Sequence, residues 1–190
     1  MIKFIDNAFI GGQTFTAGMM GYFDTATESQ LVANGDAVPF PVVVQPVEVL
    51  AMSSQPIACS TTGADEALAS FTIPAGLMGV NSSLQIEPVW THANSATNKI
   101  LKVKIGVTAV YSVTRTTSAR EGPLIVLSNR NSLSSQIQPY DSAYLTAGAT
   151  NPATYTIDFS KTQIIQITGN RAITEALTLE YFRILHFVGS

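Results

Sequence analysis

The sequence predicts an all-β protein, an antiparallel jelly-roll sandwich preceded by a small N-terminal β-rich module that carries one short helix. Two observations predict this fold class. Leu101, Val103 and Ile105 alternate with Lys102 and Lys104, which is the period of a strand with one buried face. Similar segments recur at short intervals from residue 68 onward, with turn residues and no helical period between them, as in sandwich folds.

About eight strands are expected in residues 68–190, the predicted sandwich and trimerisation domain. Turn-forming residues lie between successive strands at short intervals, as expected for an antiparallel fold. The expected strands include 84–90, 101–105, 107–117, 124–127, 155–159, 164–168 and 177–187, and the turns fall at 79–82, 94–98, 122–123, 148–152 and 169–170.

Residues 1–41 are predicted to form the small N-terminal module. Its helical signal begins at Thr25 or Thr27, continues through Leu31 and stops at Asn34-Gly35. A threonine cap at the start and a glycine at the end are typical of a short helix. Prolines at positions 39 and 41 then end the regular structure.

Residues 42–67 are predicted to be an extended arm or linker. An apolar extended segment interrupted by a proline is expected to pair with a sheet edge or with another subunit. We therefore expect the arm to exchange between subunits through Val42, Val43, Val44, Val47, Val49 and Leu50.

The composition favours burial against partners. Apolar residues make up 46% of the 190 residues and charged residues only 12%, about half the usual share. The net charge of −3, with thinly spread cations, argues against nucleic acid as a partner. No apolar run approaches the length of a membrane helix, and no signal-peptide core follows Met1. A neutral polar surface and contacts with partners would keep such a chain in solution.

The sequence predicts neither an enzyme nor a metal or cofactor site. It lacks a phosphate-binding glycine loop, a zinc-binding pattern and a nucleophile motif. The single Cys59 is expected to be a small buried or half-buried thiol and not a nucleophile, and such a chain suits a reducing cytoplasm. We expect His92 to be a satisfied or solvated side chain at a strand end. His186 is expected to pack in the core or at an interface.

Two alternatives involve sugars. Asp65-Glu66 and Asp141 could in principle form a glycosidase pair, but solvated loop carboxylates are the simpler interpretation. Trp90, Tyr140 and Tyr144 could stack on a glycan, although buried strand aromatics are commoner.

Several motifs resemble a β-sandwich domain found in virion proteins of tailed bacteriophages. Members of that family open with TIPAG and NGxLRIxxxW, followed by NKxxxVxxG and NRNSxxSQ. The matching residues here, spread over roughly 70–185, are Phe71–Gly76, Asn81–Leu84, Ile86-Glu87, Trp90-Thr91, Asn98-Lys99, Val103, Gly106, Asn129–Ser132 and Ser135-Gln136. The N-terminal segments around Ile10-Gly11-Gly12 and Glu28–Ala37 resemble a small attachment module of phage head and tail proteins.

The resemblance implies a homotrimeric jelly roll on the virion, assembled in the bacterial host cytoplasm and attached through its N-terminal module. The expected attachment residues are Ile10, Gly11, Gly12, Leu31 and Val32. We favour a capsid cement, or decoration, protein that clamps neighbouring major capsid proteins. A short tail fibre that binds tail proteins and host glycan is the alternative, and a carbohydrate-binding lectin module is a further one.

Overall fold

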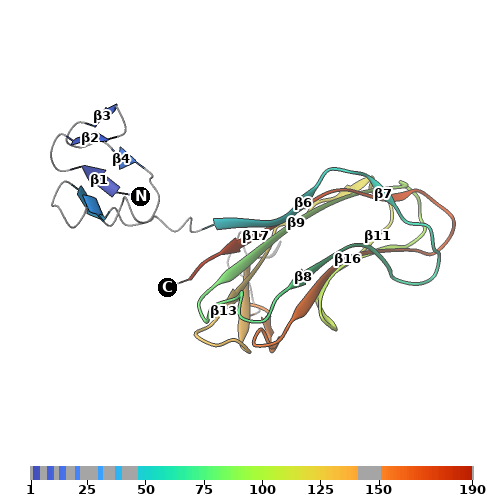
Figure 1. Cartoon of the computed structure of the whole chain (residues 1–190). Coiled ribbons are helices and arrows are strands. Elements are labelled where there is room, and N and C mark those ends of the chain that lie inside the picture. Colours follow the sequence, from blue (N-terminus) through green and yellow to red (C-terminus); the bar gives the residue numbers. More distant parts are fainter. Residues whose placement is uncertain are drawn as a thin grey trace. The chain divides into compact units, whose positions relative to one another are not determined.

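The computed structural model describes residues 2–4, 8–10, 13–15, 20–21, 30–31, 37–39, 47–140 and 151–189. The chain divides into two compact units, Met1–Gln45 and Pro46–Ser190 (Figure 1). None of the described residues forms a helix of the length and apolarity that crossing a bilayer requires.

The first unit is rich in short strands, as the sequence predicts. Its three-stranded sheet has the order β4-β1-β5, and a separate antiparallel pair joins β2 to β3. Gln30 and Leu31 are helical, and Leu31 is buried. The rest of the expected helix lies outside the described residues. The strands are β1 (Ile2–Phe4), β2 (Ala8–Ile10), β3 (Gln13–Phe15), β4 (Met20–Gly21) and β5 (Ala37–Pro39).

The second unit is a sandwich of two antiparallel sheets. One sheet has four strands in the order β11-β10-β16-β8, and the other has the order β15-β14-β13-β9-β17-β6, with β12 on β9 and β7 on β17. The strands are β6 (Val47–Ser53), β7 (Ile57–Ala58), β8 (Glu66–Ile73), β9 (Ser83–His92), β10 (Lys99–Ile105), β11 (Thr108–Arg115), β12 (Arg120–Glu121), β13 (Ile125–Asn129), β14 (Gln136–Tyr140), β15 (Thr154–Tyr155), β16 (Gln163–Arg171) and β17 (Leu177–Phe187).

The strand order is that of a jelly roll. Taken in chain order, the eight framework strands are β6, β8, β9, β10, β11, β13, β16 and β17. Numbered one to eight in this order, the strands of the four-stranded sheet are neighbours in the order 2-7-4-5, which is β8-β16-β10-β11. Those of the larger sheet are neighbours in the order 1-8-3-6, which is β6-β17-β9-β13. This arrangement of eight strands in two sheets is the double Greek key of jelly rolls. Figure 1 shows β6, β9 and β17 in one layer and β8, β11 and β16 in the facing layer.

The core lies between the two sheets and confirms the predicted alternation. In β10, Leu101, Val103 and Ile105 are buried, whereas Lys102 and Lys104 are only partly covered. The facing sheet contributes buried side chains at the same period of two, among them Leu84, Ile86, Trp90, Leu179 and Ile184. Burial of apolar surface between the sheets is the main term that stabilises such a fold.

The structure corrects the boundary expected at residue 67. The second unit begins at Pro46, and β6 pairs with β17 of the same chain along its whole length. The reason is topological, because β6 is the first of the eight jelly-roll strands and β17 needs a neighbour on that side. Residues 42–44 lie outside the described residues, and exchange of the arm between subunits stays a prediction.

Candidate functional site

Four chain connections meet at one end of the sandwich, which we call the loop end. They are residues 59–65, 93–98, 116–119 and 172–176. Backbone hydrogen bonds join them to each other and to nearby strand ends: Gly63 N to Arg171 O, His92 N to Ala119 O, Ala93 N to Ala176 O and Ala172 N to Asn98 O, at 2.9–3.1 Å. A jelly roll brings these connections together because alternate crossovers between its sheets leave at the same end.

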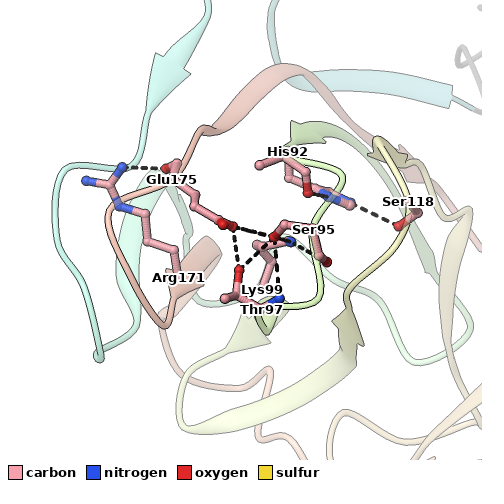
Figure 2. A network of polar contacts seen from close by, with 8 residues as sticks. His92, Ser95, Thr97, Lys99, Ser118, Arg171 and Glu175 are labelled. Atoms are coloured by element: carbon pink, nitrogen blue, oxygen red, sulfur yellow. Dashed lines mark hydrogen bonds and ion pairs between the residues drawn. The ribbon is translucent and has the colours of Figure 1, made fainter.

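Lys99 lies at the centre of the loop end. It is the first residue of β10 and is fully buried. Its Nζ is 2.9 Å from Ser95 Oγ, 3.3 Å from the Ser95 carbonyl oxygen and 3.6 Å from Glu175 Oε2 (Figure 2). A buried ammonium requires such partners, because an unpaired charge in a core is strongly unfavourable.

Glu175 completes this cluster from the connection between β16 and β17. Thr97 Oγ1 and Ser95 Oγ donate hydrogen bonds to Glu175 Oε2 at 2.5 and 2.7 Å. The hydrogen bond from Thr97, followed by that from Ser95, lowers the pKa of the Glu175 carboxyl below its usual range. Glu175 is therefore ionised at neutral pH and balances the charge of Lys99.

Arg171 and His92 extend the contacts to the other two connections. The Arg171 guanidinium donates to the carbonyl oxygens of Thr61 at 3.0 Å, Ser60 at 2.9 Å and Glu175 at 2.6 Å. On the other side, His92 Nε2 lies 3.5 Å from Ser118 Oγ (Figure 2). His92 is buried at its strand end and has polar neighbours, which agrees with a satisfied histidine.

Glu66 organises the first connection of the loop end. Its Oε2 accepts hydrogen bonds from the backbone N–H groups of Ser60 and Thr61, both at 2.7 Å. These bonds, led by that from Thr61, lower the pKa of Glu66 to about 2. Cys59 is buried beside it, and burial raises the pKa of the thiol. A raised pKa leaves little reactive thiolate, and the burial of Cys59 agrees with the expected small thiol.

Asp65 faces away from this carboxylate toward two lysines. Its Oδ2 is 2.8 Å from Lys104 Nζ and 2.9 Å from Lys102 Nζ. The hydrogen bond from Lys104 is the largest cause that lowers the pKa of Asp65 to about 2. The lowered pKa values of Asp65 and Glu66 are the opposite of the raised pKa that a glycosidase acid needs. Asp141 lies outside the described residues.

The aromatic residues singled out for sugar stacking do not form a described platform. Trp90 is fully buried, and its ring stacks on Tyr111 with a centroid separation of 6.4 Å and an interplanar angle of 16°. Its indole face is therefore covered by protein. The Tyr140 side chain and Tyr144 lie outside the described part of the chain.

The remaining expected site residues are scattered. Ile10 ends β2 and Leu31 is buried in the first unit, whereas Gly11, Gly12 and Val32 lie outside the described residues. In the arm, Val47 and Val49 are exposed and Leu50 is half-buried at an irregularity of β6. His186 is buried, as expected, with Nδ1 3.2 Å from Glu48 Oε2.

Sequence reasoning missed the pairing of Lys99 with Glu175. One signal could have found half of it, because position 99 continues the inward series of Leu101, Val103 and Ile105. Glu175 sits in a connection where no periodicity applies. Among the described residues, no cluster of three or more His, Cys, Asp or Glu side chains is placed to hold a metal ion.

No protein-family model and no curated protein matches the sequence. Among solved structures, the chain is similar to the CBM2 module of the evolved Dit of Lactobacillus casei BL23 phage J-1, at 12% identity over 64% of this chain and 69% of that chain, with a TM-score of 0.36. It is also similar to structures of infectious bursal disease virus. For the Gt strain the identity is 15% over 75% of this chain and 33% of that chain, with a TM-score of 0.28. For the Gx strain the identity is 14% over 76% of this chain and 42% of that chain, with a TM-score of 0.24.

Proposed function

We propose that this protein is a structural component of a tailed-phage particle, a capsid cement protein that clamps neighbouring major capsid proteins. The observation that carries the proposal is the position of the motif residues in the jelly roll. The resemblance to phage virion domains rests on these residues. Their roles in the structure therefore indicate whether the resemblance concerns the architecture or a chemical activity.

Three of the motif residues, Gly76, Asn129 and Gln136, lie at the end of the sandwich opposite the loop end, whereas Asn98-Lys99 belong to the loop end itself. Asn129 and Gln136 are buried, and Gln136 Nε2 donates to Asn129 Oδ1 at 3.0 Å. Asn129 Nδ2 donates to the Gly79 carbonyl oxygen at 2.8 Å. Gln136 also exchanges two hydrogen bonds with the backbone of Ile157, at 2.8 and 3.0 Å. Such buried side-chain amides specify how distant segments join.

The first motif has a backbone role. Gly76 ends the Phe71–Gly76 match in the left-handed region, with φ of 81°, directly after β8. A glycine takes this conformation without steric cost. These motif residues thus hold together one end of the jelly roll. A resemblance that rests on the architecture supports a shared structural role in the particle more than a shared reaction.

The proposed working form is a homotrimer attached through the first unit. Only 12% of the residues are charged, and contacts between copies would cover part of a surface with so few charges. Closed cyclic symmetry suits a component repeated on a regular shell. The separate unit Met1–Gln45 supplies an anchor distinct from the jelly-roll body.

Labelling of the particle tests the role. Cryo-electron microscopy of particles carrying a tagged chain is expected to show density over the whole head lattice. Density at the tail only would contradict the cement role and support the short tail fibre, in which the same unit docks to tail proteins.

Glycan binding is the second candidate, and the loop end favours it. Its connections carry exposed polar residues, including Ser60, Thr61 and Asn94, on a framework held by the Lys99 cluster. The hydroxyls of Ser60 and Thr61 already donate to Glu66. A glycan array probed with the full chain tests this candidate. Binding that is lost on changing loop-end residues would support the receptor-binding or lectin role, and an array without hits would remove it.

A further inference from the structure

We propose that the outer face of the eight-stranded sheet, where β6, β17, β9 and β13 lie side by side, binds a second copy of this chain. The inference rests on the proposed self-assembly and deepens it by naming the contact surface. We call this surface the assembly face and define it by Val47, Val49, Met52, Leu124, Arg183 and Glu87.

The strand register places these side chains on one face. Val49 is aligned with Leu185, Leu185 with Gln85, and Gln85 with Val126, so one row crosses all four strands. Met52, Arg183 and Glu87 form the next row. The alternate positions Leu84, Ile86 and Ile184 fill the core, and side chains alternate between faces along a strand. The rows named here therefore point away from the core, and within them Leu185 is already buried in the single chain.

The apolar side chains of the assembly face are strongly exposed in the single chain. Val49 is 61% exposed, Met52 62% and Leu124 51%, and Val47 is exposed beside them. Val49 and Met52 lie on β6, which ends its sheet in the described part of the chain. Val47, Val49 and Met52 thus expose apolar groups on one edge strand, and such a strand marks an interaction surface because an uncovered one promotes aggregation.

The charged groups in the middle of this face are already paired with each other. Arg183 Nη2 and Nε lie 2.7 and 2.9 Å from Glu87 Oε2, and Gln85 Nε2 donates to the other Glu87 oxygen. A partner that covers the face would therefore not leave either charge alone in a dry interface, which is the costly case. The pair carries no net charge.

The opposite face of the sandwich differs in character. Outward positions of the four-stranded sheet are mostly polar, including Lys102, Lys104, Ser70, Thr72 and Ser112, with Ile164 as an exposed apolar exception. Two sheets of one sandwich that differ in this way indicate that solvent covers one and protein the other. The contrast assigns the interface to the sheet that contains β6.

The neutrality of the assembly face identifies its occupant. A strongly charged partner would find no complementary field on it, whereas identical copies can approach without mutual repulsion because the central charges cancel within each copy. Interfaces between permanent partners are also more apolar than the remaining surface. A second copy is thus the partner that this surface fits.

The experiment compares the full chain with a charged variant, V49D/M52D, by light scattering at micromolar concentration. The wild type is expected at three times the chain mass of 20.2 kDa, and the variant at a single chain mass. V107D is the matched control, because Val107 is fully exposed in the β10–β11 turn and outside the assembly face. It should keep the wild-type mass.

The outcomes separate the two proposals. A monomeric wild type would overturn both self-assembly and this inference. A wild-type oligomer that V49D/M52D leaves intact would overturn the assembly face alone. If V49D/M52D fails to fold by circular dichroism, oxidative cross-linking of M52C replaces it. M52C should then give covalent dimers and V107C should not, and equal cross-linking of the two would contradict the inference.

Discussion

The buried ammonium of Lys99 and the carboxylate of Glu175 lie 3.6 Å apart and connect the four-stranded sheet to the segment that enters β17. The two ends of this pair are unequal. Lys99 is fully buried, whereas the Glu175 side chain keeps 18% of its surface in contact with water. Loss of either partner should therefore have a different effect on stability.

We predict that E175Q destabilises the protein more than K99M does. E175Q leaves a buried cation without a neutralising charge, whereas K99M leaves a carboxylate that water and two hydroxyls still solvate. The expected fall in Tm is roughly 5 °C or more for E175Q. Thermal unfolding followed by circular dichroism measures it, and a larger fall for K99M would refute the explanation.

Acid should weaken the second unit over a defined pH range. Asp65 and Glu66 have pKa values of about 2 in the folded protein, held there by Lys104 and by the Thr61 N–H group, below their ordinary values of 3.8 and 4.5. The unfolded chain therefore binds protons first as the pH falls, so stability is complete above about pH 4.5 and decreases toward pH 2. Denaturant titrations at several pH values should show this decrease, and D65N should make it shallower. An unchanged slope in D65N would exclude Asp65 as a contributor.

The strands that alternate clearly could be predicted from sequence, but their connections could not. In β10 the period of two correctly separated Leu101, Val103 and Ile105 from the lysines between them. The place of β6 depends on its pairing with β17, whose Leu185 faces Val49 from the far end of the chain. Local pattern carries no information about such a partner, so the sequence alone predicts an arm for residues 42–67.

At the loop end, too, burial of single side chains could be predicted from sequence but contacts between connections could not. Burial is the usual state of an aromatic side chain on the apolar face of a strand and of an unpaired cysteine, and Trp90 and Cys59 are both buried. The polar cluster depends on which connections meet in space. Glu175 reaches Ser95 and Thr97 only because the jelly-roll crossovers bring both connections to one end. That meeting is a property of the topology and not of either segment.

Trp90 should report the folding of the second unit. It is the only tryptophan, it is fully buried, and its ring contacts Tyr111. W90F is expected to fold, whereas W90A should lose about 3–5 kcal/mol of stability because it leaves a cavity. Chemical denaturation measures both changes. Tryptophan emission should remain unchanged when sugars are added, and a sugar-dependent shift would support the glycan-binding candidate over the cement role.

Gly169 should not tolerate a side chain, although it lies in a regular strand. A Cβ at this position would be 2.8 Å from Leu177 Cδ2 and 3.1 Å from Leu68 Cδ1, both in the core. G169A should therefore cost about 1–3 kcal/mol through overpacking. G122A is the control, because its Cβ would make an ordinary contact of 3.7 Å with Val89. Equal stabilities of the two variants in urea titrations would contradict this packing argument.

Deletion of residues 1–45 should separate attachment from folding. The boundary between Gln45 and Pro46 leaves all eight jelly-roll strands in the remaining chain, including β6. We expect the truncated protein to show the same cooperative loss of Trp90 emission as the full chain, because a domain with its own core folds by itself. It should fail to cosediment with phage particles that lack the protein, whereas the full chain should bind them. Binding of the truncated protein would move the anchor to the jelly roll. A protein that lacks residues 1–67 is the informative comparison, because this longer deletion also removes β6. It should fail to fold if β6 is a framework strand and not a linker.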